Sequence, residues 1–142
     1  MARGQVDLKS QIVFLGLVLA QGAHSVEEYR YRLYEVFAPA RAVSMLASDD
    51  PATGFVIVNV ALVAFGLWCF LLPLRLGWPN ARGFLWFWSI LEMANGIGHL
   101  ALAGSRGGYF PGAGTAPLLV VLAGWLAVLL ARRVAAPDSS LS

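Results

Sequence analysis

Residues able to do acid–base or metal chemistry gather in two short stretches of an otherwise apolar sequence. One stretch is His24-Ser25-Val26-Glu27-Glu28, and the other carries Glu92, Asn95 and His99. Within each stretch the chemical side chains lie three or four residues apart, so a helix places them on one face. Ionisable groups inside an apolar segment are costly and mark a functional site by default. We therefore predict a catalytic set consisting of His24, Glu27, Glu28, Glu92 and His99.

Acid–base catalysis without a metal is the first chemistry that this set allows. A buried carboxylic acid can protonate an alkene, epoxide or ketone, while a His–Glu pair removes a proton elsewhere. Such chemistry suits isomerisation or cyclisation of a lipophilic substrate. We place it slightly ahead of metal chemistry because the number of candidate metal ligands is irregular, and the spacing also lacks the Glu-x-x-His pair of di-iron bundles.

Metal binding is the second chemistry. Two histidines and several carboxylates form a nitrogen and oxygen ligand set that suits iron, zinc or manganese. The predicted ligands are His24, Glu28, Glu92 and His99, and the activity would be that of a metal-dependent hydrolase or oxidoreductase. A third class stays open, a small transporter or lipid-binding protein that uses the same residues as a relay.

Other polar residues lie where they can contact a substrate, and some of the catalytic candidates have a structural alternative. The predicted substrate-binding residues are Gln21, Asn59, Asn95 and Tyr109. Glu27 can instead pair with arginines at the end of its helix. Glu92 can instead be a neutral acid that hydrogen-bonds a neighbouring helix, and His99 a buried histidine near a helix end.

Composition places these residues in a membrane protein. Of 142 residues, 58% are hydrophobic and 13% charged, and the mean hydropathy is +0.69. A soluble domain has about a quarter charged residues. The net charge is only +2 and the basic residues flank apolar runs, which excludes a nucleic-acid-binding surface. The single cysteine excludes an intrachain disulfide.

The apolar runs predict an all-α, polytopic protein with four transmembrane helices in one up-down bundle. The predicted spans are residues 8–34, 55–74, 83–103 and 116–133, followed by a flexible tail at 135–142. A short interfacial helix is expected at 40–47. The first run is interpreted as a span rather than a cleaved signal peptide, because its polar stripe continues in helical phase through residue 35.

Alternating helix directions predict where the polar residues meet. The end of the first span, the start of the second and the end of the third fall in one half of the bundle, which predicts a polar cavity in one leaflet. Six basic residues flank the side with the termini and four the other, so both termini are expected in the cytoplasm. The expected partners are the lipid bilayer and a hydrophobic small molecule, with a homo-oligomer required for transport.

Three motifs together resemble those of one family. His24-x-x-Glu27-Glu28, the Glu92…Asn95…His99 stripe and Tyr109-x-Pro111-Gly112 are similar to those of the HXXEE-domain family of small bacterial membrane proteins. The resemblance covers residues 15–130. It implies an integral protein of the bacterial inner membrane and supports the same polar residues, but it implies no particular reaction.

Overall fold

The computed structural model describes residues 6–132, and throughout that range the regular structure is helical. The four long helices are α1 (Leu8–Arg30), α4 (Pro51–Cys69), α5 (Ala81–Arg106) and α6 (Ala116–Arg132). Two short helices, α2 (Leu33–Val36) and α3 (Ala38–Met45), connect α1 to α4, and one π-helical segment (Phe70–Leu74) continues α4. The predicted all-α class is confirmed. The predicted tail at 135–142 and residue 133 lie outside the described residues.

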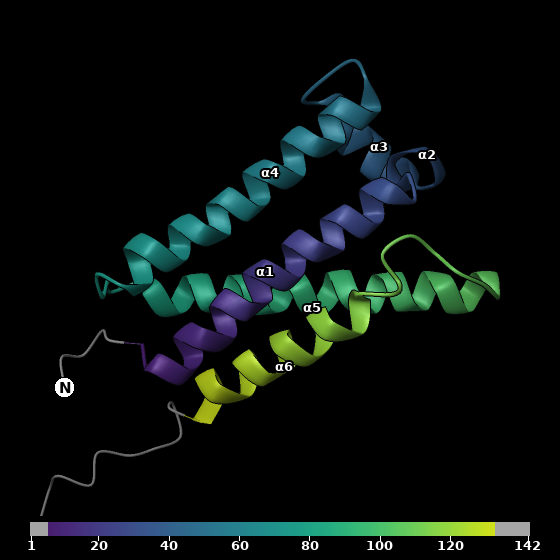
Figure 1. The fold of residues 1–142 in the computed structure, drawn as a ribbon. Helices are drawn as coiled ribbons and strands as arrows, with labels where there is room; N and C mark the ends of the chain where they lie inside the picture. The colour runs from purple at the N-terminus through teal and green to yellow at the C-terminus, as the bar shows by residue number, and fades with distance from the viewer. Residues whose placement is uncertain (1–5, 133–142) are drawn as a thin grey trace, which may run out of the picture.

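Consecutive long helices run in alternating directions (Figure 1). In the view of Figure 1, α1 lies between α4 and α6, and it packs against both. The helix α5 packs mainly along α6, whereas α4 packs mainly against α1 and α3. The end of α1, the start of α4, the end of α5 and the start of α6 therefore lie at one end of the molecule.

The short helix predicted at 40–47 is Ala38–Met45, and the third span predicted at 83–103 is Ala81–Arg106. The two largest differences from the predicted boundaries are at the end of the first long helix and the start of the second. The first helix ends at Arg30 instead of continuing to residue 34, because Arg32 adopts a left-handed conformation with φ 56°. The second begins at Pro51 instead of residue 55. There the Asp50 carboxylate accepts a hydrogen bond from the Thr53 amide at 2.9 Å, and proline at the first helical position needs no amide partner.

Two apolar clusters border the end of the molecule that holds the polar residues. The larger packs α1, α5, α6 and the π-helical segment around Phe14, Leu17 and Trp88. The smaller joins Leu33, Tyr34, Phe55 and Phe110. Within the described residues, the segment Pro51–Leu74 is long and apolar enough to cross a membrane, and α6 is a shorter apolar helix.

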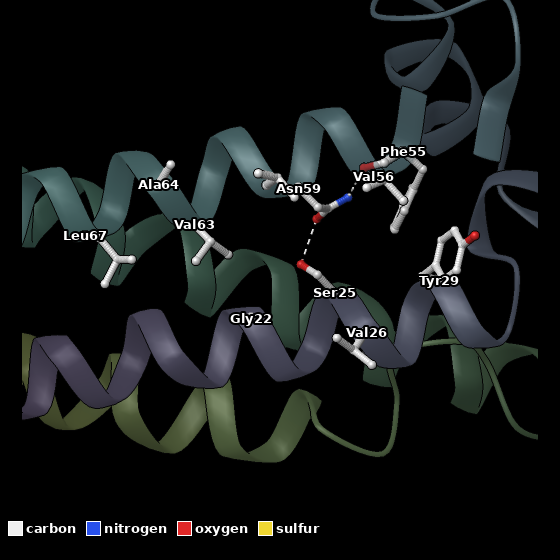
Figure 2. A pocket seen from close by; sticks show the side chains of 11 residues that line it. Gly22, Ser25, Val26, Tyr29, Phe55, Val56, Asn59, Val63, Ala64 and Leu67 are labelled. Atoms are coloured by element: carbon white, nitrogen blue, oxygen red, sulfur yellow. Dashed lines mark hydrogen bonds between the residues drawn. The ribbon is translucent and has the colours of Figure 1, made fainter. Parts of the chain in front are cut away.

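A groove of about 420 Å³ runs between α1 and α4 (Figure 2). Its walls are mostly apolar, and Ser25 and Asn59 hydrogen-bond across it at 2.7 Å. This differs from the predicted polar cavity between the first three spans. The polar side chains instead pack against one another between the helices, and the groove beside them is lined mostly by apolar side chains.

Candidate functional site

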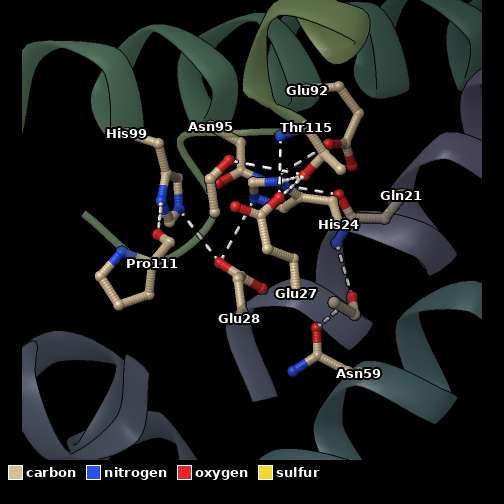
Figure 3. Close-up of polar contacts among 12 residues, drawn as sticks. Gln21, His24, Glu27, Glu28, Asn59, Glu92, Asn95, His99, Pro111 and Thr115 are labelled. Atoms are coloured by element: carbon tan, nitrogen blue, oxygen red, sulfur yellow. Dashed lines mark hydrogen bonds and ion pairs between the residues drawn. The ribbon is translucent and has the colours of Figure 1, made fainter. Parts of the chain in front are cut away.

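Three acceptor atoms converge inside the molecule, two from α1 and one from α5 (Figure 3). Glu28 Oε1 lies 3.4 Å from His24 Nε2 and 3.0 Å from His99 Nε2. One ligand atom from each of the three residues falls within 4.8 Å of the others. All three side chains are buried, and His24 Nε2 has no hydrogen-bond partner. Burial without a partner is expensive for such groups, so this arrangement calls for a bound cation or a shared proton.

The loop between α5 and α6 fixes which nitrogen of each histidine carries a proton. His99 Nδ1 donates to the Pro111 carbonyl at 2.6 Å, since a carbonyl can only accept. Thr115 donates its hydroxyl hydrogen to Glu27 at 2.6 Å, so at 2.7 Å it accepts from His24 Nδ1. When the rings are neutral, the lone pair of each Nε2 is therefore directed toward Glu28. This is how metal-binding histidines are oriented by groups around the site.

Close packing holds this loop against the two imidazole rings. Gly112 has φ +90°, and a Cβ built there would lie 2.5 Å from His99 Nδ1 and 2.7 Å from His24 Cε1. Only glycine fits both the backbone conformation and the space. The loop is therefore a direct wall of the site.

Glu27 connects α1 to the same loop. Its carboxylate accepts hydrogen bonds from the Gly114 amide at 2.9 Å, the Thr115 amide at 2.8 Å, the Thr115 hydroxyl and the Tyr109 hydroxyl. Partial desolvation of its hydroxyl and the hydrogen bond to Glu27 raise the pKa of Tyr109, which keeps this phenol a donor. We predicted Glu27 as catalytic or paired with arginine. Its contacts anchor the loop and, through Thr115, orient His24, while its catalytic role stays a prediction.

A second set of polar residues lies on the same faces of α1 and α5, farther into the molecule than the three converging atoms. Asn95 Nδ2 lies 3.3 Å from both Glu92 Oε2 and Gln21 Oε1, and Gln21 Nε2 donates to Ser25 at 3.0 Å. Ser25 in turn donates to Asn59 in the groove wall. A hydrogen-bonded chain thus leads from the groove to Glu92, whose Oε1 is buried without a partner.

Glu92 does not join the three converging atoms, although we predicted it as a fourth metal ligand. It precedes His99 by seven residues, which is about 10 Å along a helix. Sharing a helix face is therefore not enough to share an ion, because ligand atoms must come within about 2 Å of it.

The two distances that Glu28 makes to the histidine nitrogens match the spacing of metal ligands. Two ligands at about 2.1 Å from an ion are about 3.0 Å apart in octahedral geometry and about 3.4 Å apart in tetrahedral geometry. The two distances from Glu28 are 3.0 and 3.4 Å. Two imidazoles and one carboxylate also leave coordination positions open for substrate or water.

The structure brings together most of the predicted residues and adds others. His24, Glu28 and His99 meet directly, while Gln21, Asn59, Glu92 and Asn95 form the adjacent chain. Tyr109 is mostly exposed and contacts Glu27. Ser25, Thr115 and the Pro111 carbonyl were not predicted. A threonine just before a helix is a recognisable capping residue, whereas no sequence signal marks a carbonyl.

Comparison with known proteins identifies a family and no function. No curated protein and no solved structure matches the chain. One family model matches residues 15–127, a range that contains every residue of the site described above. Because that match spans more than half of the chain, the protein belongs to the family described as proteins of unknown function with the HXXEE motif.

Proposed function

We propose that the protein is a membrane-embedded, metal-dependent enzyme that acts on a lipophilic small molecule. His24, Glu28 and His99 hold one divalent transition-metal ion in this proposal. The observation that carries it is the buried, unpartnered Nε2 of His24, which points at a carboxylate already shared with His99. A bound cation satisfies all three atoms at once.

When held by these three residues, the ion would supply Lewis acidity or redox chemistry, and its identity would separate a hydrolase from an oxidoreductase. The residues of this chain do the rest. Pro111 and Thr115 keep Nδ1 of the histidines protonated, and the two apolar clusters keep bulk water away.

The membrane part of the proposal is supported by the apolar segment Pro51–Leu74 and by the surface of the other long helices. Each of them exposes large apolar side chains, among them Ile12 and Leu19 on α1, Ile90 on α5 and Val121 on α6. Exposed apolar surface of this extent is costly in water and matches lipid. We propose four spans in a bacterial inner membrane with both termini in the cytoplasm.

Metal content of detergent-purified protein tests the proposal. Elemental mass spectrometry is expected to find about one equivalent of zinc, iron or manganese. The variants His24→Ala and His99→Ala should lose it, while Asn59→Ala, which changes a residue outside the three ligands, should keep it. Folded protein that stays free of metal after reloading would overturn the proposal.

Metal-free acid–base catalysis remains the second candidate, favoured by the 3.0 Å contact between Glu28 and His99. Those two groups can pass a proton to and from a substrate without any ion. Isomerase or cyclase turnover of lipophilic alkenes or epoxides by metal-stripped protein would establish this candidate instead.

A further inference from the structure

The groove between α1 and α4 contains a hydrogen-bond donor on Asn59 that the protein does not use. Asn59 accepts from Ser25 through Oδ1, and its Nδ2 donates to the Phe55 carbonyl at 2.9 Å. An amide nitrogen carries two hydrogens. The second Nδ2 hydrogen of Asn59 has no acceptor among the described residues, and Asn59 lines the groove. A ligand with an oxygen acceptor would satisfy it.

The remaining walls select a hydrocarbon chain. From Asn59 to Leu67 the α4 side is formed by apolar residues, and this stretch is about 12 Å long at 1.5 Å per residue. Gly22 on α1 leaves the opposite wall open, with Val63 Cγ2 at 3.9 Å from a Cβ built there. Small-molecule sites typically have this combination of apolar walls and few polar groups, with volumes of roughly 300–1,000 Å³.

We propose that this groove binds an amphipathic molecule, with its hydrocarbon chain along Val63 and Leu67 and an oxygen acceptor on Asn59. The chain of hydrogen bonds through Ser25, Gln21 and Asn95 would connect the bound oxygen to Glu92 (Figure 3). The occupant is a neutral long-chain alcohol, aldehyde or ketone, because no cation lines the groove to pair with an anionic head. The claim that this molecule is the substrate rests on the proposed function, whereas the claim that it binds in the groove does not.

Photolabelling tests the binding. Protein in nanodiscs is irradiated with a diazirine analogue of hexadecanol or with the matching diazirine hydrocarbon, and labelled peptides are mapped by mass spectrometry. We expect the alcohol to label residues 22–29 and 55–67 about three- to tenfold more than the hydrocarbon does, the range that one hydrogen bond provides. Asn59→Leu should remove that preference.

A pair of glycine variants separates the groove from general lipid contact. Gly22→Leu places a side chain in the groove and should reduce alcohol labelling at least fivefold. Gly16→Leu is the same change on the same helix, outside the groove and with open space around its Cβ, and should leave labelling unchanged. Equal labelling of both variants, or no preference for the alcohol over the hydrocarbon, would overturn the proposal.

The two proposals fail separately. Gly22→Leu should keep its metal because the three metal ligands do not line the groove. His24→Ala should lose metal and still be labelled in the groove. If the protein binds no metal and labelling of the groove persists, the groove is still a ligand site and only the proposal of a metal-dependent enzyme is refuted.

Discussion

The Thr115 hydroxyl is the most informative single group to remove. Thr115→Val keeps the size of the side chain and deletes one oxygen, so no large cavity forms. That oxygen accepts from His24 Nδ1 at 2.7 Å and donates to Glu27 at 2.6 Å. Because His24 is fully buried, its Nδ1 hydrogen is left without an acceptor, at a cost of about 1–3 kcal/mol. Removing such a partner of a metal ligand lowers affinity by roughly 10- to 100-fold.

Competition with a fluorescent chelator at fixed pH measures this loss as a ratio of Kd values for zinc. Thr115→Ser restores the hydroxyl and should bind metal within about threefold of the unchanged protein, a small part of the hydroxyl's effect. Thermal unfolding of the metal-free variants checks that the fold survives. If valine and serine variants bind metal equally well, the orienting role of Thr115 is refuted.

Three other predictions follow from the packing around the site. Gly112→Ala should abolish metal binding because its Cβ would overlap both imidazole rings, while Gly108→Ala, with nothing within 4 Å, should bind normally in the same titration. Gly96→Val should lower the free energy of unfolding by at least about 1–3 kcal/mol in a denaturation series, because even a Cβ would lie 2.9 Å from a backbone oxygen of α6. Glu92→Gln should keep its metal by mass spectrometry and Glu28→Gln should lose it; metal loss in both would mean that Glu92 is a ligand after all.

Much of the helix order can be predicted from sequence, because each long apolar run is bounded by proline, glycine or arginine. The end of α1 is an exception. The stripe of polar residues continues in phase to Glu35, and nothing in the local sequence indicates that Arg32 adopts a left-handed conformation. The helix ends there because the chain turns to pack Leu33 and Tyr34 into the smaller apolar cluster. Tertiary packing overrides the local pattern.

For the candidate site, too, some contacts can be predicted from sequence and others cannot. His24 and Glu28 are one helical turn apart, so their contact follows from spacing alone, and alternating helix directions bring His99 to the same end. The contacts of Glu27 and Thr115 depend on a loop rich in glycine, where no periodicity constrains the path. Glu92 shares a helix face with His99 but lies about 10 Å away along the axis, so its place outside the three converging atoms follows from the rise per residue, and its catalytic role stays a prediction.

The α5–α6 loop supplies the group that hydrogen-bonds Nδ1 of each histidine. The site can therefore be complete only after this loop has been synthesised and placed. The residues with converging atoms are made early, on α1 and α5, but Pro111 and Thr115 are set in place only when α6 has packed beside them. A nascent chain that ends before α6 carries all three ligands and lacks the groups that orient them. Under the proposed function, capture of the ion would therefore be a late step of membrane insertion, and metal retention would report that the last helix has docked.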